Sequence, residues 1–124
     1  MIALLRNEEG ADHVRTVLAE ETSGWFAHGV NICEVFYNFL RRGDQSAARE
    51  AVKDLRSGGM RVREDLDEVF WEQAGWYKVQ FHMSLADAFL LSLAKRLGAE
   101  VLTSDRKEFG PVAQAGLCRV RFFR

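Results

Sequence analysis

Apolar residues recur at helical spacing over several stretches of this chain, and they alternate or cluster over shorter ones. Positions three and four apart mark one face of a helix, whereas alternation marks a half-buried strand. The spacing predicts helices over residues 1–10, 11–21, 31–42, 45–57, 65–80 and 84–97, and a short helix or turn over 105–112. Strands are predicted over residues 25–30, 60–63, 100–103 and 117–123. Strands separated by helices predict an α/β fold with a parallel sheet, whose ligands bind beyond the carboxyl ends of the strands.

The same pattern predicts which side chains are buried. The helix over residues 84–97 is apolar nearly all round and should be the most buried one. The helix over residues 65–80 should turn one face inward, formed by Leu66, Val69, Phe70, Ala74 and Tyr77. Cys33 has apolar neighbours, and we expect it to be a small buried residue.

Composition narrows the class of protein. A chain of 124 residues is one domain by size, and 48% hydrophobic residues can build a core. The net charge of −1 argues against disorder and against a uniformly basic nucleic-acid binder. A nucleic acid would have to meet a local basic patch. The candidates, each of which is otherwise an ordinary solvated pair, are Arg41-Arg42, Arg61/Arg63, Lys95-Arg96 and Arg106-Lys107.

Nothing in the sequence indicates export or membrane insertion. The two cysteines have no CxxC spacing, and no apolar run approaches the roughly 18–20 residues that span a bilayer. The N-terminal residues lack the basic and cleavage regions of a signal peptide. We therefore expect a cytoplasmic protein without membrane partners.

Three acidic residues, Glu34, Asp87 and Asp105, each lie at the start of a predicted helix. Folding would have to bring them together, and converging carboxylates repel unless a cation or shared protons neutralise them. Carboxylates without thiolates suit a hard ion such as Mg²⁺ or Mn²⁺. Asp87 is the strongest candidate, because its helix is otherwise almost wholly apolar and no cation follows it in sequence before Lys95.

Each acid also has a structural interpretation. Asn31-x-x-Glu34, Ser84-x-x-Asp87 and Asp105-x-x-Glu108 all have the spacing of a capping box. In that case Asn31 is the N-cap of its helix and orients Glu34. His13, His28 and His82 lack metal-ligand spacing and are predicted to be surface or packing residues.

Three further residues belong to the candidate site. Thr103 and Ser104 follow a predicted strand, where their hydroxyls could hold a water or a phosphate, although Thr103 is equally an ordinary strand residue. Glu108 is a fourth acidic candidate, in the outer part of the site.

Three motifs in this order resemble the PIN-domain family, most closely the VapC-type toxins. Asn31-x-x-Glu34 is similar to the second acidic motif of the family, Ser84-Leu85-Ala86-Asp87-Ala88 to the third, and Thr103-Ser104-Asp105 with Glu108-Phe109 to the fourth. The resemblance covers essentially the whole chain. It implies a PIN-like three-layer sandwich with a central parallel sheet flanked by helices.

The resemblance also implies an activity. Members of the family are Mg²⁺- or Mn²⁺-dependent endoribonucleases, in which the acids hold one or two ions that activate water and stabilise charge on the phosphate. Glu34, Asp87 and Asp105 would be the catalytic residues. The substrate would be single-stranded or looped RNA, gripped through its backbone by Arg and Lys. Toxins of this size pair with a small VapB-like antitoxin, in a type II toxin-antitoxin system, and form homodimers.

One feature of the family is absent from residues 1–124. Family members open with a short hydrophobic strand that ends in Asp, whereas residues 1–10 resemble the helix that follows it. We therefore expect residues 1–124 to be one PIN-like domain, N-terminally truncated relative to the family. We also expect it to be markedly less stable than a form with that strand, and nearly inactive.

Two alternatives stay open at this stage. The chain could be a PIN-like module that binds RNA or a protein but lost activity with its first acid. It could also be a small α/β interaction domain in which the acids are only helix caps.

Overall fold

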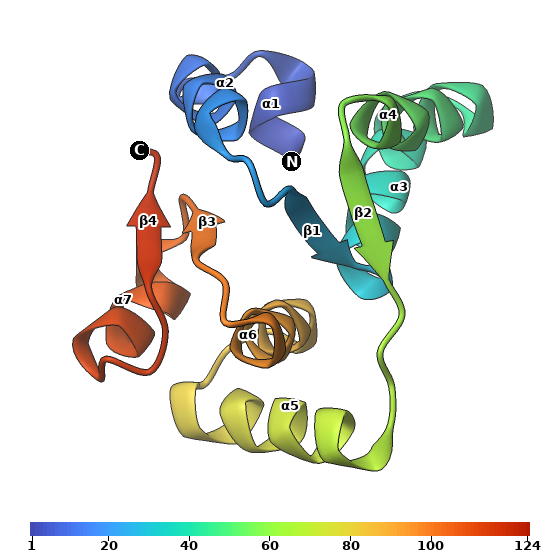
Figure 1. The fold of residues 1–124 in the computed structure, drawn as a ribbon. Coiled ribbons are helices and arrows are strands. Elements are labelled where there is room, and N and C mark those ends of the chain that lie inside the picture. The colour runs from blue at the N-terminus through green and yellow to red at the C-terminus, as the bar shows by residue number, and fades with distance from the viewer. The chain divides into compact units, whose positions relative to one another are not determined.

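The computed structural model describes all residues from Met1 to Arg124. Helices and strands follow one another in the order α1 (Ile2–Arg6), α2 (Ala11–Glu20), β1 (Trp25–His28), α3 (Gly29–Arg42), α4 (Gln45–Ser57), β2 (Met60–Arg63), α5 (Glu68–Phe81), α6 (Leu85–Leu97), β3 (Val101–Thr103), α7 (Arg106–Gln114) and β4 (Val120–Phe122) (Figure 1). The chain divides into two compact units, an N-terminal unit (Met1–Arg63) and a C-terminal unit (Glu64–Arg124). None of the helices is both long and apolar enough to cross a membrane.

The strands form two parallel pairs, one in each unit. β1 pairs with β2, with Trp25 opposite Met60, and β3 pairs with β4, with Val101 opposite Val120. The helices α3 and α4 connect the first pair, and α7 connects the second (Figure 1). The predicted α/β class with parallel strand pairing is confirmed.

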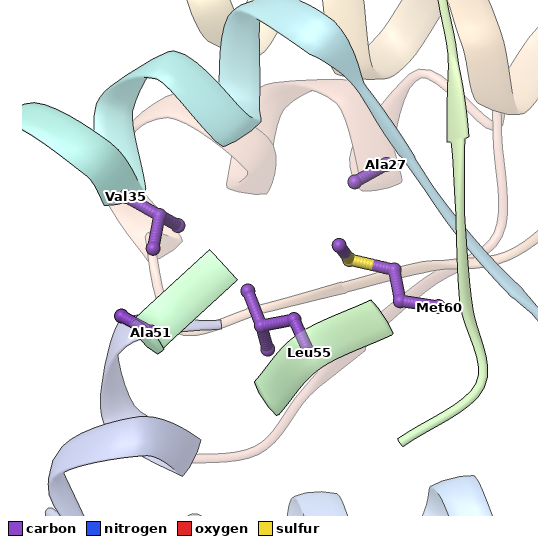
Figure 2. Close-up of a cluster of buried hydrophobic side chains, with 5 residues drawn as sticks. All are labelled: Ala27, Val35, Ala51, Leu55 and Met60. Atoms are coloured by element: carbon purple, nitrogen blue, oxygen red, sulfur yellow. The ribbon is translucent and has the colours of Figure 1, made fainter. Parts of the chain in front are cut away.

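The core of the N-terminal unit lies between its strands and the helices that connect them. Figure 2 shows its buried side chains, which come from β1, α3, α4 and β2 and are Ala27, Val35, Ala51, Leu55 and Met60. Leu55 is 2% exposed. Burying a leucine side chain of this kind contributes about 1.5–3 kcal/mol to the free energy of folding. The apolar residues spaced three and four apart along α4 therefore form the face that packs in this core.

The start of α3 differs from the prediction. His28 is the N-cap, and its Nδ1 accepts a hydrogen bond from the Val30 backbone N–H at 3.2 Å. The helix therefore begins two residues earlier than expected, and Asn31, which is 3% exposed, lies in its first turn and is not the cap. Cys33 is exposed, so its predicted burial was wrong. It precedes the buried Val35 by two positions, which turns it about 200° away around the helix.

In the C-terminal unit α5 packs on α6, and the Phe70 and Phe89 rings meet edge to face at 5.5 Å between centroids. The predicted burial of α6 is confirmed, since more than half of its residues are buried. Two predicted inward positions of α5 were wrong, because Leu66 is 61% and Val69 71% exposed. The helix starts at Glu68 and turns inward only the stripe that contains Phe70, Ala74 and Tyr77.

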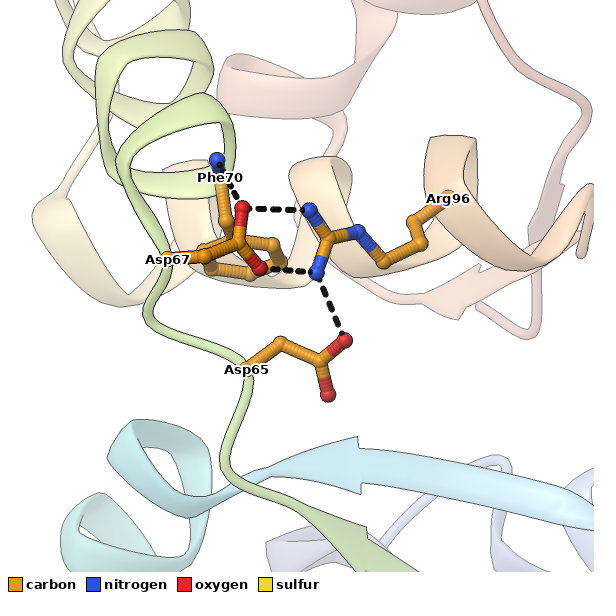
Figure 3. Close-up of polar contacts among 4 residues, drawn as sticks. All are labelled: Asp65, Asp67, Phe70 and Arg96. Carbon is orange, nitrogen blue, oxygen red and sulfur yellow. Dashed lines mark hydrogen bonds and ion pairs between the residues drawn. The ribbon is translucent and has the colours of Figure 1, made fainter.

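The helix α5 begins three residues later than predicted because Asp67 is its N-cap. The Asp67 carboxylate accepts a hydrogen bond from the Phe70 N–H at 3.1 Å. Arg96 near the end of α6 grips both of its oxygens, at 2.6 and 2.9 Å, and also reaches Asp65 at 2.9 Å (Figure 3). Asp65, where the helix was expected to start, lies in the loop before α5 and connects that loop to α6 through its bond with Arg96.

Candidate functional site

Asp87 lies in the first turn of α6 and is held by the residue that caps the helix. The Ser84 Oγ accepts a hydrogen bond from the Asp87 N–H at 3.1 Å and donates one to Asp87 Oδ2 at 2.8 Å. The predicted cap at Ser84 is confirmed. In a capping box the acid would accept from the N–H of the cap residue, but the Ser84 N–H donates to Glu108 Oε2 at 2.8 Å instead.

Asp105 follows β3 and caps α7. Its Oδ1 accepts a hydrogen bond from the Glu108 N–H at 2.9 Å, and the Thr103 Oγ1 accepts one from the Asp105 N–H at 3.0 Å. Thr103 thus fixes the turn between strand and helix, while Ser104 lies in that turn and its carbonyl accepts from the Arg106 N–H. The Glu108 carboxylate does not bond within α7 and instead accepts the hydrogen bond from Ser84, the N-cap of α6.

These bonds bring three of the predicted acids together. Carboxylate oxygens of Asp87, Asp105 and Glu108 all lie within 4.8 Å of one another, with Asp87 and Glu108 half-buried and Asp105 exposed. Asp105 and Glu108 form no ion pair with a basic side chain. Helix dipoles favour carboxylates in these first turns, but three of them in one place repel, and a cation would relieve that repulsion.

The residues fit a small divalent ion. Magnesium takes oxygen ligands at about 2.0–2.1 Å. The three carboxylates each offer an oxygen within 4.8 Å of the others, so they are near enough to share one ion. The donor set is oxygen alone, as Mg²⁺ and Mn²⁺ prefer.

Comparison with known proteins agrees with this chemistry. A family model described as the PIN domain matches residues 1–114. The chain belongs to the PIN-domain family. No curated protein and no solved structure gives a significant match.

Membership in the PIN-domain family gives the acidic cluster its context, since PIN domains are nucleases that typically use divalent metal ions. The cluster of Asp87, Asp105 and Glu108 lies at the start of α6 and after β3. For Asp105 this is the carboxyl end of a parallel strand, the edge where α/β sheets bind ligands.

The remaining PIN-motif residues lie in the N-terminal unit. Glu34 is half-buried in the second turn of α3, and Asn31 is buried one turn before it. The two belong to a different compact unit from Asp87 and Asp105. The participation of Glu34 in a shared site stays a prediction.

Sequence reasoning missed one residue of this candidate site. Ser84 bonds the Asp87 carboxylate through its hydroxyl and the Glu108 carboxylate through its backbone N–H. The Ser-x-x-Asp spacing is the signal for the first contact. The contact with Glu108 joins residues 24 positions apart, and no local pattern indicates it.

Proposed function

We propose that this protein is a Mg²⁺- or Mn²⁺-dependent endoribonuclease of the VapC type, the toxin component of a type II toxin-antitoxin system. The observation that carries the proposal is the convergence of the Asp87, Asp105 and Glu108 carboxylates in a chain of the PIN-domain family. The order of the motifs, from Asn31-x-x-Glu34 to Thr103-Ser104-Asp105, supports the VapC type.

The acids would hold the metal. Asp87, Asp105 and Glu108 present oxygens to one point, and Glu34 is the further ligand that the family motif supplies. A bound Mg²⁺ or Mn²⁺ supplies a Lewis acid that activates water and stabilises charge on the phosphate. Ser84 orients Asp87, and Thr103 holds the backbone of Asp105, so both carboxylates are positioned before an ion binds.

The two compact units are proposed to act as one PIN domain. The family match covers residues 1–114 and therefore crosses the boundary between Arg63 and Glu64. A VapB-like antitoxin and a second copy of the chain are the proposed protein partners, on the strength of the VapC-like motif order. Exposed apolar side chains on α5 supply surface for such contacts.

A second function is favoured by the hydrogen bonds of the acids. The Asp105 carboxylate caps α7 and the Glu108 carboxylate accepts from the start of α6, as purely structural residues would. The alternative is therefore a non-catalytic PIN-like module that binds RNA or a protein.

Metal binding and RNA cleavage separate these functions. We expect Mn²⁺ at 100 times its dissociation constant to stabilise the wild-type protein by about 2.7 kcal/mol, because the ion binds only the folded state. Asp87→Asn and Asp105→Asn should lose most of this gain and all Mg²⁺- or Mn²⁺-dependent cleavage of single-stranded RNA. The readouts are thermal unfolding with and without EDTA and gel analysis of a labelled RNA.

The matched control is Asp54→Asn, which removes the same charge from the exposed surface of α4. It should respond to Mn²⁺ like the wild type. An equal Mn²⁺ response of wild type and Asp87→Asn would mean that the acids are only caps. A Mn²⁺ response without cleavage would favour the non-catalytic module.

A further inference from the structure

Arg106 lies on an aromatic ring beside the acidic cluster. It is the first residue of α7 and directly follows Asp105, and its guanidinium carbon lies 4.5 Å from the centre of the Phe122 ring. Phe122 is opposite Thr103 in the β3–β4 ladder. Both residues therefore lie at the carboxyl end of this parallel pair, the end at which Asp105 lies.

No Asp or Glu side chain pairs with Arg106. Its Nε donates to the main-chain oxygen of Arg124 at 3.2 Å, and its two terminal nitrogens make no hydrogen bond. Two other arginines of the C-terminal unit are paired with acids. Arg96 is held by two aspartates, and Arg121 pairs with Glu100 at 3.1 Å.

These contacts distinguish the two basic pairs of the C-terminal unit that were candidates for binding a nucleic acid. In the pair Lys95-Arg96, the Lys95 ammonium donates to the Leu117 carbonyl oxygen and Arg96 is ion-paired. In the pair Arg106-Lys107, both side chains are exposed and neither is paired with an Asp or Glu side chain. Only the second pair keeps its positive charge available for a ligand.

The stacked arrangement suits a phosphate. A guanidinium presents a planar fork of N–H groups that matches two phosphate oxygens. Contact with the ring and the bond from Nε restrict the side chain, so less conformational entropy is lost when a ligand binds. The cation also offsets the repulsion between a phosphate and the neighbouring carboxylates.

We propose that Arg106, held on Phe122, is a positioning residue that binds a backbone phosphate of single-stranded RNA next to the acidic cluster. The proposal rests on the function proposed above and names the residue that places the substrate. A phosphate contact carries no base preference, so Arg106 contributes affinity and placement without sequence selection.

The test is RNA binding in EDTA, where cleavage cannot occur. A fluorescently labelled single-stranded RNA is titrated with wild type, Arg106→Gln and Arg106→Lys at several salt concentrations, with anisotropy as the readout. One lost phosphate contact should weaken binding about fivefold at 0.1 M salt and reduce the salt slope by about 0.7. Arg106→Lys should keep the slope, because the charge remains, but bind more weakly because the fork is lost.

Arg119→Gln is the matched control. Arg119 is exposed and precedes β4, so it lies at the opposite end of the strand pair from Phe122 and carries the same charge. Its substitution should leave both affinity and slope near the wild-type values. Phe122→Leu should keep the salt dependence of RNA binding, because the charge of Arg106 remains. It should weaken the affinity, because the ring that holds the Arg106 guanidinium in place is lost.

The outcomes separate this proposal from the function itself. Equal affinity and slope for Arg106→Gln and Arg119→Gln would overturn the role of Arg106, even if the wild type cleaves RNA. Absence of RNA binding by the wild type would overturn it as well. Binding that depends on Arg106, in a protein that cleaves nothing, would support the phosphate contact and count against the nuclease.

Discussion

The Glu108 carboxylate accepts a hydrogen bond from the Ser84 backbone N–H at 2.8 Å, which ties α7 to the first turn of α6. Ser84 in turn bonds the Asp87 carboxylate through its hydroxyl. Glu108 therefore holds the start of the helix that carries Asp87. Asp105 completes the arrangement, since it accepts from the Glu108 N–H.

Glu108→Gln and Glu108→Ala should differ in the metal-free protein. The glutamine carbonyl can still accept from the Ser84 N–H, whereas alanine leaves that N–H without its acceptor at a cost of about 1–3 kcal/mol. We expect Glu108→Ala to lower the melting temperature and to speed hydrogen exchange of the Ser84 amide. Glu108→Gln should match the wild type in EDTA, and equal loss in both variants would show that charge, not the hydrogen bond, matters there.

Ser84→Ala should weaken both the helix and the metal response. The substitution removes the N-cap of α6, which costs about 0.5–2 kcal/mol, and removes the hydrogen bond from the Ser84 hydroxyl to the Asp87 carboxylate. The predicted results are a lower melting temperature in EDTA and a smaller gain on adding Mn²⁺. Ser84→Thr keeps the hydroxyl and should restore most of both. A Mn²⁺ gain unchanged in Ser84→Ala would show that Asp87 needs no such support.

The ion pair between Arg96 and Asp67 should affect the stability of the protein at low pH. The hydrogen bonds from Arg96 lower the pKa of Asp67 to about 2. A lowered pKa means that the stabilising contribution is present above the unfolded-state pKa of about 3.9 and disappears as the pH falls towards 2. In Arg96→Gln this part of the decline in melting temperature between pH 4 and pH 2 should be missing, and NMR titration should show the Asp67 pKa returning towards 3.9. An unchanged Asp67 pKa in the variant would contradict the assignment.

The exposed apolar face of α5 should mediate self-association. Val69, Trp76 and Val79 are 71%, 59% and 74% exposed, which is more apolar surface than one helix usually leaves in water. Val79→Lys should shift the mass measured by light scattering at micromolar concentration towards that of one chain. Leu40→Lys, at an exposed position on α3, is the control and should not. A wild-type protein that is already monomeric would contradict self-association through α5.

Local rules account for much of the structure. The apolar period placed the helices, and Asp44, Ser84 and Asp105 cap the helices that they precede. These features depend on residues within one or two turns of each other, so the sequence contains them. The errors occurred where two caps competed, as at His28 and Asn31, because residues a few positions apart can all close a first turn.

By itself, then, the amino-acid order determined most of the elements, the caps at Asp44, Ser84 and Asp105, and the membership of the PIN-domain family. Only the tertiary structure decided which acids meet, that Glu108 reaches Ser84, and that Arg96 selects Asp67 as the start of α5. The bond from Ser84 to Glu108 and the bond from Arg96 to Asp67 join residues 24 and 29 positions apart. Such contacts form only when packed helices bring distant segments together, and no periodicity within a segment encodes its distance from another.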